Sequence, residues 1–352
     1  MLKKLSQSLS QGHHLSASDV SAAVRELTDE KIPADTKADF LVALAKKGET
    51  WEEISAFANA LRALSVPPPL DAETREREIL DVCGTGGDRL NTFNISTTVA
   101  IVVASAGVTV AKHGNRAITS QAGSADVLEA LGVTIDLTPE QAARSLRERN
   151  FAFFFAPKYH PAFKNIAPAR KLCAERGQRT IFNFLGPLLN PARPSAQLIG
   201  VPHPSLCEPV ARVLQSLGAR RGMVVCGCVP VEGGDLRYLD EISTLGENYI
   251  AEFFQDCGFN ASMFTPAHYP LQKATLADLS GADRAANAEI VRRILSGGER
   301  GPRRDAVLLN AGAALFVAGR SKSMLEGWDL AAESIDSGAA KAKLDQLCAP
   351  LP

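Results

Sequence analysis

An apolar helix between two apolar strands constrains the fold of this chain more than any other feature. Residues 79–83, ILDVC, and residues 108–112, VTVAK, indicate strands, and residues 97–107, TTVAIVVASAG, indicate a buried helix between them. A strand, a helix and a second strand within about 30 residues form a βαβ unit, which requires parallel strands. Residues 151–157, FAFFFAP, predict another strand, apolar on both faces as expected deep in a parallel sheet.

The rest of the chain extends this pattern and adds a separate region at the start. Later strands are predicted at AQLIGV, GMVVCG and YIAEFF, and residues 305–319, DAVLLNAGAALFVAG, predict a central helix because they are almost wholly apolar. Residues 1–66 carry apolar residues at helical spacing and end at Pro67-Pro68-Pro69, which stops helix propagation. We therefore expect a helical domain at residues 1–70 and an α/β domain at 71–352 with a mostly parallel central sheet. Part of 160–195 is expected to pack with the helical domain.

Composition excludes several classes of protein. The net charge of −1 favours neither nucleic acid nor a membrane surface, and no apolar run reaches the ~20 residues that span a bilayer. The first residues lack the apolar core of a signal peptide, so we expect a cytoplasmic protein. Seven dispersed cysteines argue against a disulfide framework. Cys226 and Cys228 form the only close pair, which fits a strand better than a zinc site.

Two loops at the ends of the first strands carry polar groups suited to phosphate. Residues 84–97 combine glycines, Asp88 and several hydroxyl and amide side chains ahead of a helix. They match neither the Rossmann fingerprint nor the P-loop, and alone they fit a polar tight turn equally well. Residues 111–126, AKHGNRAITSQAGSAD, add a lysine and an arginine after the second strand. Because α/β sheets bind ligands at the carboxyl ends of their strands, the two loops together predict a ligand with more than one phosphate.

Two further positions have both a structural and a functional interpretation. Asp240 and Glu241 follow a strand in YLDEIST, where they could be an exposed charged turn or a magnesium site. The phosphate loops favour the magnesium site. Residues 156–171, APKYHPAFKNIAPARK, could form a helix with Phe163, Ile166 and Ala167 packed inward, and Arg170 would lie near its end, where it could bind a carboxylate or compensate the helix dipole.

Taken together, these segments resemble the anthranilate phosphoribosyltransferase family over nearly the whole chain. The similarity is carried by GTGGD, TFNIST, KHGNR, GSADVLEALG, FAPKYHPAFKNIAPAR, RTIFNFLGPLLNP, LDEIS and LLNAGAALFVAG, in this order. The resemblance implies a nucleoside phosphorylase/phosphoribosyltransferase-like fold and a homodimer formed through the helical domain. It also implies transfer of the phosphoribosyl group of phosphoribosyl pyrophosphate (PRPP) to the amino group of anthranilate, an early step of tryptophan biosynthesis.

The family's site residues carry over motif by motif. Anthranilate would contact Gly84, Asn115 and Arg170, and magnesium, with two ions per site, would bind Ser96, Asp240 and Glu241. The residues that would bind PRPP lie in the two loops: Gly84, Gly87, Asp88, Thr92, Asn94, Ile95, Ser96, Thr97, Lys112, His113, Gly114, Asn115, Arg116, Ala117, Ile118, Thr119, Ser120 and Ser124.

The chain departs from the family pattern at Arg89, Ala117, Thr119, Ala122 and Tyr238. The family often has small or serine residues in the loops and a glycine before LDE. These departures affect individual side-chain hydrogen bonds and leave the backbone cradle intact.

The implied chemistry needs no strong general base, because the aromatic amine of anthranilate is nearly unprotonated at neutral pH. We therefore assign no residue as acid or base and expect catalysis mainly from positioning. His113 is expected to be structural or to position a ligand. Two rival interpretations are an enzyme of the same fold with another acceptor, such as a pyrimidine nucleoside phosphorylase, and a non-catalytic relative that binds nucleic acid.

Overall fold

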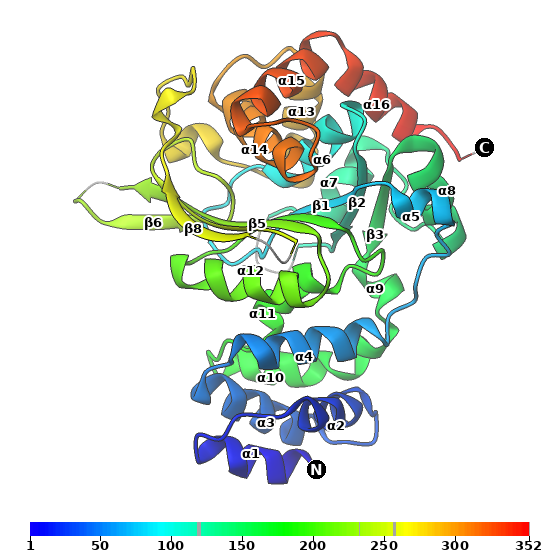
Figure 1. The fold of residues 1–352 in the computed structure, drawn as a ribbon, viewed down its shortest axis with the longest axis vertical. Coiled ribbons are helices and arrows are strands. Elements are labelled where there is room, and N and C mark those ends of the chain that lie inside the picture. Colours follow the sequence, from blue (N-terminus) through cyan, green and yellow to red (C-terminus); the bar gives the residue numbers. More distant parts are fainter. Residues whose placement is uncertain (118–120, 232, 256–257, 352) are drawn as a thin grey trace.

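The computed structural model describes residues 1–117, 121–231, 233–255 and 258–351. A bundle of helices from the start of the chain stands below a twisted sheet, and a second group of helices covers the sheet from above (Figure 1). The bundle contains α1 (Leu2–Ser10), α2 (Ala17–Thr28), α3 (Ala34–Lys47) and α4 (Trp51–Arg62).

Local sequence signals set the bounds of several helices. Gly48, with a φ of +86°, ends α3, a conformation that favours glycine. Thr50 and Glu53 form a capping box at the start of α4, as their spacing predicts. Thr138 and Gln141 form another at the start of α8 (Pro139–Arg149).

The central sheet has the strand order β3-β2-β1-β4-β5-β7-β8, with β6 paired to β5. The first five strands in this order are parallel, and β6, β7 and β8 are antiparallel to their neighbours. The mostly parallel sheet expected from the βαβ pattern is therefore confirmed. The strands are β1 (Ile79–Gly84), β2 (Thr109–Gly114), β3 (Phe151–Phe155), β4 (Ala196–Gly200), β5 (Arg221–Pro230), β6 (Leu236–Leu239), β7 (Asn248–Phe254) and β8 (Gly258–Phe264).

Strand β3 lies at the edge of the sheet, whereas its apolar sequence predicted an internal position. Four of its five residues are nevertheless buried. Helix α8 packs on β3, and Phe154 contacts the buried ring of Tyr159. Helical cover, and not a second neighbouring strand, therefore explains why this strand is apolar on both faces.

Helices cover both faces of the sheet. The apolar helix α6 (Ile95–Ser105) packs on β1, β2 and α14 (Pro302–Val317), and α14 is buried over nearly its whole length, which confirms the prediction of a central helix. On the other face α12 (Cys207–Ser216) packs on β5, β7 and α4. The remaining α-helices are α5 (Ala72–Glu76), α7 (Ser124–Leu131), α9 (Ala156–Tyr159), α10 (Ala167–Glu175), α11 (Phe182–Leu185), α13 (Arg284–Leu295), α15 (Met324–Asp336) and α16 (Ala339–Cys348).

The helical bundle shares one apolar core with the lower face of the sheet. This cluster runs from Leu2 through Phe57 and α10 to Phe253 in β7. Helix α10, which lies far along the sequence, packs on α3 beside α4 (Figure 1). The bundle does not bury all of its apolar surface by itself, and α10, α11 and α12 of the same chain cover part of it.

The two polar loops and the segment after β3 begin at the carboxyl ends of neighbouring parallel strands. Strand β1 ends at Gly84, β2 at Gly114 and β3 at Phe155. Within the described residues, no helix combines the length and apolar character that crossing a membrane would need. The six cysteines outside the undescribed segments are all free thiols, and Cys226 and Cys228 both lie buried in β5.

Candidate active site

A cavity of about 1130 Å³ opens at the carboxyl ends of β1, β2 and β3. The two polar loops form one side of it, and the segment from α9 to η2 (Gly186–Leu189) forms the other. Ligand pockets commonly enclose about 300–1,000 Å³, so this volume accommodates two small substrates together.

Asp240 reaches the cavity because the residues that pack against it, Gly84, Gly86 and Gly200, have no side chains. The Asp240 Oδ2 atom accepts a hydrogen bond from the Gly86 N–H group at 2.5 Å, and Gly86 has a φ of +76°. A Cβ atom on Gly84 would lie 2.7 Å from the same oxygen, and one on Gly200 would overlap the carbonyl oxygen of Asp240. Only residues without a side chain allow this carboxylate to approach the glycine loop.

Glu241 points to the other end of the same loop. Its Oε1 atom accepts a hydrogen bond from the Ser96 N–H group at 3.2 Å, at the start of α6. A carboxylate is favoured at a helix N-terminus because the unpaired N–H groups point toward it. The Asn310 side chain of α14 then holds the backbone after Glu241, through two hydrogen bonds of 2.9 Å to Ile242. The chain bends at Asp240 and Glu241, so both carboxylates reach the loop between β1 and α6, one at Gly86 and the other at Ser96.

These carboxylates are not the exposed turn that the sequence allowed. Asp240 is only 8% exposed, and Asp88 lies close to its backbone, with the Asp240 N–H group 3.5 Å from Asp88 Oδ2. Burial and the neighbouring charge of Asp88 raise the pKa of Asp240 well above its usual value. Burial also raises the pKa of Glu241 to about 7. A buried excess of negative charge of this kind fits a hard divalent cation, which prefers carboxylate oxygens.

Lys112 lies beneath the cavity floor as the buried counter-charge of these groups. Its Nζ atom donates to the Val82 carbonyl oxygen at 2.7 Å and lies 3.5 Å from Ser96 Oγ. Its charge lowers the pKa of Glu241 and of Asp81, opposing burial, which raises the pKa of Asp81 to about 6. Lys112 belongs to the end of β2 and not to the loop after it, so its ammonium group faces carboxylates and a carbonyl oxygen.

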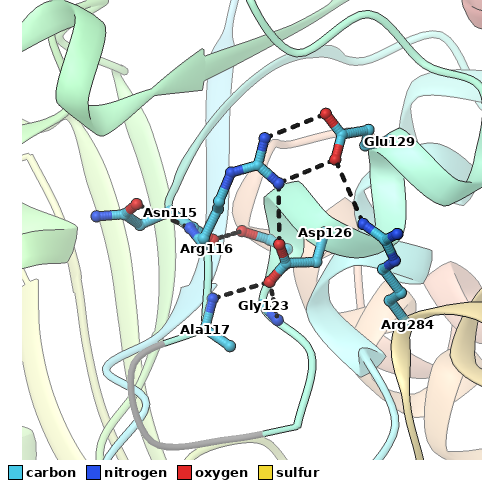
Figure 2. Close-up of polar contacts among 8 residues, drawn as sticks. Asn115, Arg116, Ala117, Gly123, Asp126, Glu129 and Arg284 are labelled. Atoms are coloured by element: carbon cyan, nitrogen blue, oxygen red, sulfur yellow. Dashed lines mark hydrogen bonds and ion pairs between the residues drawn. The ribbon is translucent and has the colours of Figure 1, made fainter.

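The second loop places Asn115, Arg116 and Ala117 on the cavity wall. The Arg116 guanidinium pairs with Asp126 at 3.1 Å and with Glu129 at 2.9 Å, so in this state its charge is already balanced (Figure 2). The expected PRPP contacts at Ile118, Thr119 and Ser120 lie outside the described residues.

Arg170 forms part of the opposite wall. It is the fourth residue of α10, because Ile166 separates the 3₁₀ segment η1 (Pro161–Asn165) from a helix that begins only at Ala167. The expectation that it lies near a helix end was therefore wrong, and compensation of a C-terminal dipole does not explain it. The guanidinium stacks on the Phe182 ring, 5.4 Å from its centroid. Burial lowers the pKa of Arg170, and no carboxylate among the described residues offsets this loss of hydration.

Two buried histidines stand between these walls. The Nε2 atoms of His113 and His160 lie 3.2 Å apart, and His113 Nδ1 donates to the Gly186 carbonyl oxygen at 3.2 Å. Burial lowers the pKa of His113 to about 3 and that of His160 to about 4. Both rings are therefore neutral at pH 7.

We expect this pair to make the protein less stable in acid. An unfolded histidine binds a proton near pH 6.5, whereas folded His160 does so only near pH 4, so the unfolded state binds more protons between these values. The contribution of His160 to the free energy of unfolding should therefore fall by about 2 kcal/mol as the pH is lowered from 7 to 5, whereas the buried carboxyl groups, whose pKa is raised, contribute in the opposite direction. Denaturant unfolding at both pH values measures this loss.

The comparison of variants isolates the effect. The free energy of unfolding of wild type minus that of His160→Asn should fall by about 2 kcal/mol from pH 7 to pH 5, whereas His268→Asn, at an exposed histidine, should keep the pH dependence of wild type. Equal pH dependence in wild type and His160→Asn would contradict the role given to His160.

Most residues selected from the sequence line this one cavity. They are Gly84, Asp88, Thr92, Asn94, Ile95, Ser96, Thr97, Lys112, His113, Gly114, Asn115, Arg116, Ala117, Ser124, Arg170, Asp240 and Glu241. Gly87 instead packs on Pro202, 3.1 Å from where its Cβ would be.

Sequence reasoning did not select several residues that build the site. Gly86, His160 and Phe182 line the cavity, and Gly200 and Asn310 position Asp240 and Glu241. Gly86 belongs to the glycine motif GTGGD, and His160 belongs to FAPKYHPAFKNIAPAR. Both motifs could have led to these residues. No sequence pattern indicated Gly200, because the backbone that packs against it belongs to Asp240, 40 positions later in the chain.

The structure describes four of the five departures from the family pattern, and Thr119 lies outside the described residues. Arg89 lines the cavity and adopts a φ of +58°, a conformation that favours glycine. Ala117 bonds Asp126 through its backbone N–H group, which no side chain alters. Ala122 is 7% exposed, and Tyr238 stacks edge-on against His203.

Comparisons with known proteins agree over both parts of the chain. Residues 3–65 match the family described as the glycosyl transferase family, helical bundle domain, and residues 76–341 match the glycosyl transferase family, a/b domain. The anthranilate phosphoribosyltransferase of Alkaliphilus metalliredigens (strain QYMF) is 46% identical over 333 residues, which cover 95% of this chain and 93% of that protein.

Solved structures show the same similarity. The crystal structure of anthranilate phosphoribosyltransferase from Thermus thermophilus has a TM-score of 0.86 and 41% identity, covering 98% of each chain. The Saccharomyces cerevisiae enzyme in complex with PRPP and Mg has a TM-score of 0.85 and 27% identity, covering 98% of this chain and 96% of that chain.

Proposed function

The chain belongs to the anthranilate phosphoribosyltransferase family, and from this premise we propose how its cavity holds the two substrates and transfers a group between them. The enzyme moves the phosphoribosyl group of PRPP to the amino group of anthranilate, giving N-(5-phosphoribosyl)anthranilate and pyrophosphate in tryptophan biosynthesis. The family match sets aside a nucleoside phosphorylase and a nucleic-acid-binding relative. Since both substrates are anions that do not cross membranes unaided, we place the reaction in the cytoplasm.

PRPP lies along the glycine loop and the loop after β2. The observation that carries this proposal is the meeting of a glycine loop, a helix N-terminus and two buried carboxylates at one edge of the cavity. The backbone N–H groups of Gly86 and Ser96, which bond Asp240 and Glu241 here, are donors of the kind that bind phosphate oxygens.

Magnesium takes part in the reaction, and the residues present fit it. Asp240, Glu241 and the Ser96 hydroxyl would hold it, and we propose two ions because the two carboxylates point to opposite ends of the glycine loop. When bound, magnesium neutralises the charge that grows on the leaving pyrophosphate.

Anthranilate lies on the opposite wall. Arg170, without a carboxylate partner among the described residues, is placed to bind the acceptor's carboxylate, while Asn115 and Gly84 lie between it and the PRPP loops. Binding of the carboxylate orients the ortho amino group toward C1 of the ribose. The bond from C1 to the pyrophosphate oxygen breaks as the bond to the amine forms, and the amine nitrogen then releases one proton to the leaving pyrophosphate or to solvent. Because the amine is already unprotonated, positioning supplies most of the catalysis.

A direct assay tests this function. The purified chain should form N-(5-phosphoribosyl)anthranilate from PRPP and anthranilate in the presence of Mg²⁺, with loss of anthranilate fluorescence and release of pyrophosphate. Omitting either substrate, or chelating the metal, should stop the reaction. Binding of both substrates without product would contradict the proposal.

We also propose a homodimer formed through residues 1–70. The apolar core of this region is covered within the chain, but Met1, Trp51 and Leu64 remain 58%, 39% and 44% exposed. Light scattering at micromolar concentration should give twice the chain mass of 37.5 kDa. Trp51→Glu should shift the mass toward the monomer, whereas Leu325→Glu, at a similarly exposed residue of α15, should leave it unchanged. A wild-type monomer would refute the dimer.

A further inference from the structure

One carboxylate accepts hydrogen bonds from the backbone at both Ala117 and Gly123. The Asp126 Oδ2 atom accepts hydrogen bonds from the N–H groups of Ala117 and Gly123, each at 2.9 Å (Figure 2). Asp126 lies in the first turn of α7, so its position follows from a helix that packs on α13. The N–H groups of two residues six positions apart therefore donate to the same oxygen atom of a residue in α7.

The backbone around Ala117 packs against the backbone around Gly123, and the contact leaves no room for a side chain on Gly123. A Cβ atom on Gly123 would collide with the Ala117 nitrogen and lie 2.6 Å from the Arg116 carbonyl carbon. The Asn115 carbonyl oxygen accepts hydrogen bonds from the Ala125 N–H group at 3.2 Å and the Ser124 hydroxyl at 3.3 Å. The cavity-lining backbone at 115–117 is therefore in direct contact with that at 122–124.

Arg116 holds the carboxylate of Asp126 in the orientation that this contact needs. Its guanidinium binds Asp126 Oδ1 at 3.1 Å and both oxygens of Glu129, at 2.9 and 3.1 Å, and Arg284 lies 3.9 Å from Glu129 (Figure 2). With Oδ1 engaged by Arg116, Oδ2 faces the two N–H groups. Arg116 also balances the negative charge of Asp126, which would otherwise stand close to an anionic ligand.

We propose that Asp126 is a positioning residue for PRPP binding, which it supports by holding residues 115–117 and 122–124 in their ligand-binding arrangement. The inference rests on the proposed binding of PRPP to the loop after β2. Backbone that is held in place before the ligand arrives, as at residues 115–117 and 122–124, has less conformational freedom to lose on binding, and this raises affinity. Asp126 itself does not touch the substrate. Its removal should weaken PRPP binding more than it slows the chemical step.

Steady-state kinetics with saturating Mg²⁺ test this role. Asp126→Ala removes two hydrogen bonds to backbone groups and should raise the KM for PRPP about tenfold, with the KM for anthranilate and kcat changed less than about threefold. Asp126→Asn keeps an oxygen that can accept both backbone bonds but turns an NH2 group toward the Arg116 guanidinium, so its KM for PRPP should lie between that of wild type and that of Asp126→Ala. Glu129→Gln is the matched control. It weakens an exposed ion pair without touching the two backbone bonds, and it should leave the KM for PRPP unchanged.

A second variant tests the same contact without altering Asp126. Gly123→Ala forces the two backbone segments apart and should also raise the KM for PRPP, at a φ of −82° that alanine tolerates. Unchanged PRPP kinetics in Asp126→Ala and Gly123→Ala, or an equal rise in KM for both substrates, would overturn the inference. So would an Asp126→Asn variant as impaired as Asp126→Ala. If wild type forms no product at all, the proposed function fails instead.

Discussion

Replacing Asp240 with asparagine and Glu241 with glutamine together is expected to lower kcat about 100-fold or more, the loss typical when a group that stabilises transition-state charge is removed. The Mg²⁺ concentration that gives half the maximal rate should rise in the same variant. Both effects follow from the removal of two carboxylates that a hard cation prefers as ligands, while the size of each side chain is kept. A magnesium titration of the initial rate measures both quantities.

The same double substitution should stabilise the metal-free protein. Burial raises the pKa of Glu241 to about 7 in the folded state, against about 4.3 in an unfolded chain. The folded state therefore binds more protons between these values, and the free energy of unfolding falls as the pH rises through them. Asparagine and glutamine have no carboxyl group to ionise, so the double variant avoids this loss of stability. Its denaturant midpoint of unfolding at pH 8 without magnesium should be higher than that of wild type.

A nearby carboxylate provides the control for this variant. Asp235 is exposed directly before β6, and the Asp235→Asn variant should have the same kcat and the same magnesium dependence as wild type. Wild-type values in the Asp240→Asn, Glu241→Gln double variant would refute the metal site, and an unfolding midpoint lowered at pH 8 would refute the account of buried charge.

Replacing Arg170 with alanine should raise the KM for anthranilate roughly 10- to 150-fold, the equivalent of the ~1.5–3 kcal/mol that a hydrogen bond to a charged group contributes. The KM for PRPP should change far less, because Arg170 lies on the wall opposite the glycine loop. Arg170 also stacks on Phe182, so Arg170→Lys keeps the charge but loses the planar contact and should recover only part of the affinity. Initial rates over a matrix of both substrate concentrations separate these effects.

The neighbouring residue of α10 is the control for Arg170. Lys171 carries the same charge, but its side chain is 80% exposed, and Lys171→Ala should behave as wild type. Equal increases in KM for both substrates in Arg170→Ala would argue against recognition of the acceptor's carboxylate. They would indicate instead that the whole wall had moved.

Short-range sequence patterns predicted much of the fold because they depend on contacts between near neighbours. The βαβ unit at residues 79–112 followed from apolar periodicity, and the capping boxes at Thr50 and Thr138 followed from residues three positions apart. The candidate site depended on recognised motifs, since polar residues in two loops allowed a simple turn as well as a phosphate site. Apolar character alone misplaced β3, because an edge strand covered by helices has the same pattern as a central one.

Tertiary structure decided everything that depends on residues far apart in the chain. Asp240 bonds the N–H group of Gly86 across 154 positions, and only Gly200 leaves room for its backbone. Arg116 stays a predicted contact of PRPP, and its ion pairs with Asp126 and Glu129 could be seen only in the structure. Each of these outcomes depends on which charge or which empty space another segment brings to the same place. No local pattern contains that information, because packing of the whole chain determines it.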